Sequence, residues 1–120
     1  MYYALIASAR RRLLVANSYF VPDRSLQNVL IARARAGVDV RVLAPGPHHD
    51  QPLVRAGQRR TYARLLRGGV RIWEYGASMM HAKTLVADDV AVIGSTNMDS
   101  HSLSFLWETS VVCDAAPIAR

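Results

Sequence analysis

The chain of 120 residues lacks several features that define large classes of protein. Its single cysteine, Cys113, excludes an internal disulfide bond and says nothing about catalysis. No apolar run approaches the roughly 18 residues needed to span a bilayer. Residues 10–12 are arginines that follow the short apolar start, whereas a secretory signal peptide carries its positive charge first. We therefore expect one soluble, compact module over residues 1–120, large enough to bury a core.

Acidic residues are scarce in the first part of the chain. Residues 1–71 carry thirteen arginines and three acids, whereas residues 72–120 carry six acids against Lys83 and Arg120. The basic part either faces an anionic lipid surface or a nucleic acid, or consists of solvated helix faces. No Gly-Arg repeat or aromatic-interleaved basic stretch indicates a dedicated nucleic-acid surface.

Lysine is almost absent. Lys83 is the only lysine among fifteen basic residues, which indicates a position where a compact point charge is needed. His81 stands two residues before it, and in a strand both side chains would project from one face about 7 Å apart. A nucleophile or proton carrier beside a fixed cation suits an anionic substrate, above all a phosphate.

Two short β-prone runs follow, residues 84–87 and 90–93, separated by Asp88 and Asp89. This pattern predicts a β-hairpin with the two aspartates at its turn, although Asp-Asp is a weaker turn signal than Asp-Gly. Ala87 would then pair with Val90. The hairpin brings the segment that follows it back beside the motif.

That returning segment is Gly-Ser-Thr-Asn, residues 94–97. In the predicted register His81 falls opposite Thr96, and Ser95 and Asn97 arrive where they can donate hydrogen bonds to phosphate oxygens. Without Asn97, a partly buried histidine and a snorkelling lysine would explain the motif better than a site. With Asn97, a phosphate site is the better interpretation.

The pattern His-x-Lys-x4-Asp followed by Gly-Ser-x-Asn resembles the phospholipase D superfamily, and the wider match is closer to its bacterial cardiolipin synthases. The resemblance covers roughly residues 5 to 114, with similar segments at residues 19–23, 37–41, 69–75 and 97–103. The sequence departs from the family at two points. The spacer from Asp88 to Gly94 is one residue shorter than usual, which would tighten the turn. His101 stands where an arginine is usual, at a head-group or structural contact.

The resemblance implies an α/β/α sandwich with a mixed β-sheet and a metal-free, cofactor-free mechanism. In such enzymes a motif histidine attacks phosphorus and forms a phosphohistidine intermediate. A second histidine, from a second copy of the motif, protonates the leaving alcohol and then activates water or an acceptor alcohol. Lysines and asparagines of the motifs bind the non-bridging oxygens.

The site residues follow from the resemblance, residue by residue. His81, Lys83 and Asn97 match the family's substrate contacts. Asp88 matches the motif aspartate of the catalytic set, but its place at the turn predicts a structural role. Glu108 matches an acidic residue that accepts a hydrogen bond from the histidine's other nitrogen, which would fix the tautomer.

The chemistry needs two motifs, and no second His-x-Lys exists, since none of the other histidines (His48, His49 and His101) precedes a lysine by two residues. Either a twofold homodimer supplies one motif from each subunit, or the chain is a fragment whose N-terminal module is missing. We favour the fragment, because the sequence resembles a C-terminal module without the membrane segments usual in cardiolipin synthases. The parent protein would then lie at the bacterial cytoplasmic membrane, peripherally or through segments absent from this chain.

Alternating elements predict the α/β class. We expect helices over residues 2–10, from a cap at Asp23 to about Ala36, and from a cap at Asp50 to Arg67. Strands are expected over residues 13–20, 38–44, 70–75 and 107–113 and in the hairpin, with the motif region at about 76–103. The triplet His48-His49-Asp50 fits a turn with a helix cap better than a metal site, because no matching ligand cluster follows.

Three functions are compatible with these residues. The leading one is phosphatidyl transfer that converts two phosphatidylglycerol molecules to cardiolipin and glycerol. The second is a homodimeric single-motif phosphodiesterase or nuclease. The third is a non-catalytic module that binds anionic lipid or nucleic acid.

Overall fold

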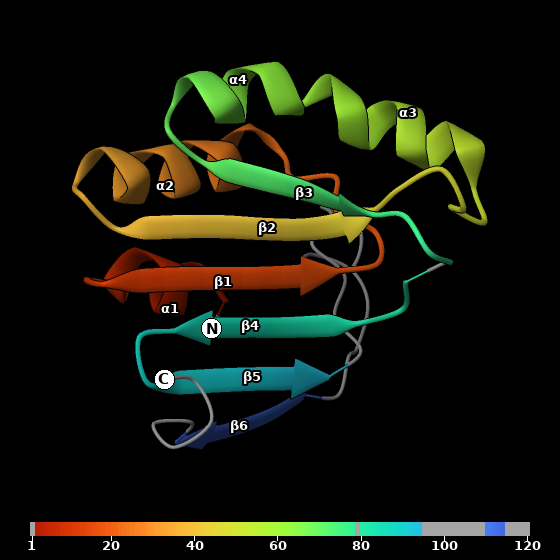
Figure 1. Cartoon of the computed structure of the whole chain (residues 1–120). Helices are drawn as coiled ribbons and strands as arrows, with labels where there is room; N and C mark the ends of the chain where they lie inside the picture. Colours follow the sequence, from red (N-terminus) through yellow and green to blue (C-terminus); the bar gives the residue numbers. More distant parts are fainter. Residues whose placement is uncertain (1, 79, 95–109, 115–120) are drawn as a thin grey trace.

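The computed structural model describes residues 2–78, 80–94 and 110–114. Its described part is a six-stranded mixed sheet with four helices (Figure 1). In chain order the elements are α1 (Tyr2–Ser8), β1 (Arg12–Asn17), α2 (Arg24–Arg35), β2 (Asp39–Pro45), α3 (Pro52–Arg60), α4 (Tyr62–Arg67), β3 (Arg71–Tyr75), β4 (Lys83–Ala87), β5 (Val90–Gly94) and β6 (Ser110–Asp114).

The strand order is β3-β2-β1-β4-β5-β6. The first three strands along the chain are parallel, because helices connect them and return the chain to the starting end. From β4 onward every pairing is antiparallel. As a result β1, β2 and β3 end, and β4 begins, at one end of the sheet, which we call the carboxyl end.

One face of the sheet carries the core. Strand side chains alternate between faces, and every second residue of β1 and β2 is buried. Paired residues share a face, so this buried set continues across β4 and meets the apolar sides of α1, α2 and α4. Its largest members are Ile6, Leu13, Phe20, Leu26, Leu30, Val40, Val42, Leu65 and Leu85.

The opposite face is open among the described residues. Leu14, Leu43, Trp73 and Val86 line a shallow cavity of about 390 Å³ there, and the Arg41 guanidinium carbon lies 6.0 Å from the centre of the Trp73 ring. The predicted α/β class and mixed sheet are confirmed. The described helices pack with the core face of the sheet, and the second helical layer of the predicted sandwich is not among the described residues.

The helix predicted from a cap at Asp23 is confirmed. The Asp23 carboxylate accepts a hydrogen bond from the Leu26 backbone N–H at 2.9 Å, which satisfies one of the free donors of the first turn. The helix ends at Arg35, and Gly37 follows with φ 94°, a conformation that glycine adopts without strain.

The single long helix predicted from Asp50 to Arg67 is wrong. Two helices, α3 and α4, meet at Thr61, where the backbone N–H and the hydroxyl both donate to the Gln58 carbonyl, at 3.1 and 2.8 Å. This tight turn interrupts the regular helical pattern. The predicted cap is also wrong, because α3 begins after Gln51 and the Asp50 carboxylate accepts from the Tyr19 hydroxyl instead.

The first two elements are shorter than predicted. Helix α1 ends at Ser8, and β1 ends at Asn17 rather than at residue 20. The Asn17 side chain explains the second difference, because its Oδ1 accepts the Tyr19 backbone N–H at 3.1 Å and turns the chain out of the strand. The last strand, β6, reaches Asp114; residues 107–109 of the prediction lie outside the described part. In the described part of the chain, no helix has the length and apolar character to cross a membrane.

Gly46, directly after β2, is packed against β3. Its N–H donates to the Tyr75 carbonyl at 3.1 Å, and an added Cβ would lie 2.7 Å from that same oxygen. Because a backbone oxygen in a strand cannot move aside, we expect Gly46→Ala to lower the free energy of unfolding by about 1–3 kcal/mol. Urea unfolding measures this loss.

Gly76→Ala is the matched control, since a Cβ at Gly76 would meet nothing within 4 Å. Its free energy of unfolding should stay within about 0.5 kcal/mol of the parent chain. Equal stability of the two variants would contradict the packing at Gly46.

Candidate active site

Lys83 is the first residue of β4 and His81 stands just before the strand. Lys83 pairs with Asn17, the last residue of β1. The motif therefore lies at the carboxyl end of the sheet, where the parallel strands also finish. In α/β proteins this end of the strands commonly forms the ligand site, because the loops that leave the strands gather there.

The strand that we predicted to contain both motif residues begins only at Lys83. His81 is exposed and outside the ladder, so its ring is not fixed by strand geometry. The Lys83 ammonium reaches back and donates to the His81 carbonyl at 3.4 Å. The Lys83 ammonium is thus held against the backbone of His81.

Buried polar residues gather at the same end of the sheet. Asn17 ends β1, Ser18 follows it directly, and His49 lies in the loop after β2; all three are almost fully buried. We missed this cluster at the sequence level. Its signal was present, since a polar pair, Asn-Ser, directly follows the apolar run of residues 13–16. Burial of polar side chains is costly unless they are hydrogen-bonded, and here Asn17 accepts from the Tyr19 backbone N–H and His49 from that of Gln51.

A second polar network fixes α3 and α4 on β3. The Glu74 carboxylate accepts from the Tyr62 hydroxyl at 3.2 Å and pairs with Arg55 at 3.1 Å and Arg59 at 3.6 Å. Burial, followed by the Glu74 charge, raises the pKa of Tyr62, so its hydroxyl stays protonated and donating. Gln58 donates to the Pro45 carbonyl at 2.9 Å and holds the end of β2 to the same helices.

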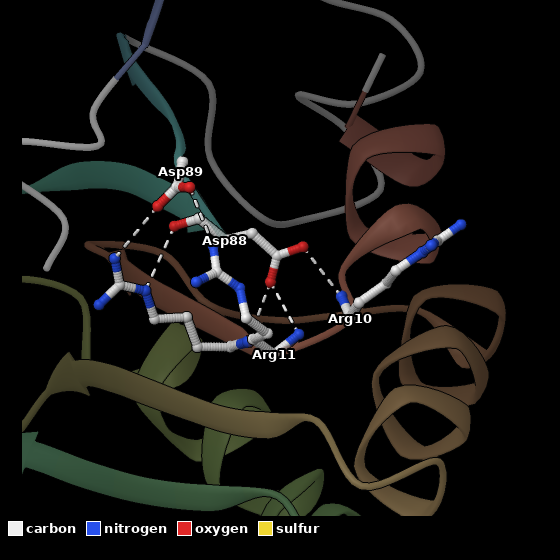
Figure 2. Close-up of polar contacts among 5 residues, drawn as sticks. Arg10, Arg11, Asp88 and Asp89 are labelled. Carbon is white, nitrogen blue, oxygen red and sulfur yellow. Dashed lines mark hydrogen bonds and ion pairs between the residues drawn. The ribbon is translucent and has the colours of Figure 1, made fainter.

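Asp88 lies at the other end of β4, at the hairpin turn (Figure 2). The pairing of Ala87 with Val90 confirms the predicted two-residue turn, and Asp88, the first of its two central residues, has φ 53°, in the left-handed region. Its carboxylate accepts the backbone N–H groups of Arg10, Arg11 and Arg12 at 3.0, 2.8 and 3.1 Å. The side chain therefore ties the turn to the start of β1.

The pKa of Asp88 is lowered by these contacts. Burial, the largest single influence, raises it, but the three backbone donors and the charge of Arg11 outweigh burial. Five residues at about 3.3 Å each separate Asp88 from Lys83, or roughly 17 Å. The structure thus gives Asp88 the structural role predicted from the turn, and places it apart from His81 and Lys83 of the catalytic set.

Three predicted site residues, Ser95, Asn97 and Glu108, lie outside the described residues, as does His101, and so does the predicted pairing of His81 with Thr96. Their roles stay predictions. Within residues 2–78, 80–94 and 110–114, no group of three or more His, Cys, Asp or Glu side chains is arranged to hold a metal ion.

Comparison with known proteins identifies the family of the chain. The family described as "Cardiolipin synthase, PLD-like domain" matches residues 2–120. The cardiolipin synthase of Geobacillus thermodenitrificans (strain NG80-2) is 40% identical over 111 residues, which cover 92% of this chain and 22% of that protein. Cardiolipin synthase B of Escherichia coli (strain K12) is 38% identical over 112 residues, covering 92% of this chain and 27% of that protein. The chain thus spans about a quarter of the length of these relatives.

A solved structure shows the same fold. Nuc from Salmonella typhimurium, a phospholipase D family member, aligns with a TM-score of 0.80 over 98% of this chain and 76% of its own, at 18% sequence identity. Since the family match extends over residues 2–120 and the motif lies where the fold gathers its loops, the chain belongs to the cardiolipin synthase PLD-like domain family of the phospholipase D superfamily.

Proposed function

We propose that this chain supplies one half of a two-motif active site that joins two phosphatidylglycerol molecules into cardiolipin and releases glycerol. The observation that carries the proposal is the position of His81 and Lys83. They stand together at the carboxyl end of the sheet, beside the last residue of β1 and near buried polar groups. Family membership and the cardiolipin synthase names of relatives near 40% identity support the lipid substrate.

The proposed reaction has two displacements at phosphorus. A ring nitrogen of His81 attacks, a P–N bond forms, and the P–O bond to glycerol breaks while the histidine of the second motif protonates the departing oxygen. That second histidine then removes a proton from the hydroxyl of another phosphatidylglycerol. The resulting oxygen attacks phosphorus and breaks the P–N bond, which regenerates His81.

Lys83 serves this scheme as a fixed positive charge. Its ammonium binds non-bridging phosphoryl oxygens, on which negative charge grows in the transition state. Asn97 and Ser95 would add hydrogen bonds to the same oxygens, and Glu108 would hold the His81 ring in one tautomer. Such an enzyme acts at the bacterial cytoplasmic membrane, where its anionic substrate is found.

A homodimeric phosphodiesterase or nuclease is the second candidate, and the single His-x-Lys motif of the chain favours it. Two copies would each supply one motif. Cleavage of DNA that weakens steeply with added salt would distinguish this function from phosphatidyl transfer. A non-catalytic binding module is the third candidate; it would bind anionic lipid equally well with His81 replaced by alanine.

The first test is hydrolysis of a small chromogenic phosphodiester by the purified chain in EDTA, beside His81→Ala, with the molecular mass measured by sedimentation. Activity from a dimer that disappears in the variant would mean that the chain completes a metal-free site itself. A folded, inactive monomer would mean that the second motif comes from a longer protein. Equal activity of the parent chain and the variant would exclude His81 as the nucleophile.

A further inference from the structure

His49 is the histidine that the proposed mechanism leaves unused. It lies between β2 and α3, at the carboxyl end of the sheet that also carries His81 and Lys83. Its side chain is fully buried, with 0% exposed, although its neighbour His48 is exposed. Because the ring is buried, each of its two nitrogens needs a hydrogen-bond partner within the protein or from a ligand.

The surroundings fix the His49 ring and its tautomer. Nδ1 accepts the backbone N–H of Gln51 at 2.9 Å, so a neutral ring carries its proton on Nε2. The Tyr19 ring packs edge-on at 5.5 Å between ring centres, and the Tyr19 hydroxyl donates to Asp50. The hydrogen bond from Gln51 and the Tyr19 ring together hold the imidazole of His49 in one orientation.

The other ring nitrogen, Nε2, has no hydrogen-bond partner among the described residues. Nε2 is shielded from solvent and makes no hydrogen bond with any residue that the structure describes. A buried N–H without an acceptor costs free energy, because it has given up its bonds to water and received nothing in return. A ligand group that reached Nε2 would supply the missing acceptor.

The charges around His49 indicate what kind of acceptor that is. Burial lowers the pKa of His49, Asp50 raises it, and the charges of Arg55 and His81 lower it further. The ring is therefore neutral near pH 7, and His81 acts on it as a charge from the same end of the sheet. Arg55 and His81 are the cations that act on His49 and would attract an anion, whereas the carboxylate of Asp50 lies 3.4 Å from Nδ1, on the side of the ring away from Nε2.

We propose that His49 is a substrate-binding residue of the His81 site, and that its neutral Nε2–H donates a hydrogen bond to a phosphoryl oxygen of the bound substrate. The inference rests on the proposed phosphoryl chemistry and adds a donor from the loop after β2 to those from the motif hairpin. A phosphoryl oxygen carries negative charge, so the bond is charge-assisted. His49 does not act as a second proton carrier, since its other nitrogen stays bonded to Gln51.

Side-chain ¹H–¹⁵N NMR of the full chain tests this directly, with inorganic phosphate as the probe and chloride at equal ionic strength as the control. We expect His49 to be neutral with its proton on Nε2 at pH 7. Phosphate should shift the His81 and His49 ring signals with one common dissociation constant. A shift at His81 alone would overturn the role of His49 and leave the proposed function standing. No shift at either histidine would overturn the phosphate site, and both proposals with it.

Two substitutions separate binding from loop anchoring. His49→Asn keeps an acceptor where Nδ1 stands but removes the donor at Nε2, whereas His49→Gln offers a donor near Nε2 and loses the acceptor for Gln51. We expect phosphate to bind about tenfold more weakly to His49→Asn, and nearly normally to His49→Gln and to the control His48→Asn. Equal weakening in both His49 variants would make His49 a loop anchor only. If either variant fails to fold, the titration of the parent chain decides.

Discussion

Replacing His81 with alanine should lower the rate of phosphatidyl transfer by about 10⁴-fold or more, in the assembly that contains both motifs. The loss is large because the nucleophile forms the covalent intermediate, and water does not substitute for it in that role. The fold should persist, since His81 is exposed and precedes β4. The rate of cardiolipin formation from phosphatidylglycerol vesicles measures the effect, and circular dichroism checks the fold.

Detection of the covalent intermediate is a second test of the role of His81. A substrate-derived adduct on the His81 ring is a phosphoramidate, which is labile in acid and stable in alkali, and peptide mass spectrometry locates it. We expect the adduct in the parent chain and its absence in His81→Ala. An adduct on another residue, or turnover within tenfold of the parent, would reject His81 as the nucleophile.

Substitutions of Lys83 should lower the rate by smaller amounts that depend on the charge that remains. Lys83→Ala removes the charge that binds the phosphoryl oxygens and should cost about 10²- to 10³-fold in rate. Lys83→Arg keeps the charge but spreads it over a planar fork, so an intermediate loss is expected. Identical rates for the two variants would mean that the positive charge at residue 83 is not what the reaction needs.

Replacing Asp88 with asparagine should lower the free energy of unfolding by about 2 kcal/mol, because the carboxylate accepts three backbone N–H groups and an amide has one oxygen for them. Asparagine tolerates the left-handed backbone that Asp88 adopts, so the turn itself is not strained. Urea unfolding at neutral pH measures the change. For a domain of this size it is a large share of the total stability.

Asp89→Asn is the matched control, with the same change of charge at the next residue of the same turn. Asp89 pairs with Arg11 at 2.9 Å and with Arg12 at 3.9 Å, and because 35% of its side chain is exposed, solvent partly screens these pairs. We expect a loss of no more than about 1 kcal/mol. An equal loss in both variants would show that charge at the turn, rather than the contacts of Asp88, stabilises the hairpin.

The free energy of unfolding should depend on pH through Asp88. The pKa of Asp88 is lower in the folded chain than its ordinary value of 3.8, so the unfolded chain binds the proton first as the pH falls. The stability from Asp88 is complete above that ordinary value and is lost as the pH falls through the folded pKa. Asp88→Asn should therefore lose less stability on acidification than the parent chain. Parallel pH profiles would contradict this.

Local pattern decided several features without help from the rest of the chain. The Asp23 cap, the end of its helix before Gly37 and the turn at Asp88 and Asp89 were all predicted, because each depends on residues a few positions apart. The helix break at Thr61 is also local, but it was missed. A threonine that bonds to a carbonyl three residues back leaves the hydrophobic pattern of the helix unchanged.

The sequence by itself determined the family, and it predicts the phosphate chemistry and the two residues proposed to carry it, because His81 and Lys83 are neighbours in one short motif. Only the tertiary structure decided what surrounds them. The strand pairing places Lys83 beside Asn17, burial encloses the His49 side chain at the same end of the sheet, and the Asp88 carboxylate finds donors 76 to 78 residues away. Such contacts follow from strand order and burial of the whole sheet, and no local pattern of residue types records them.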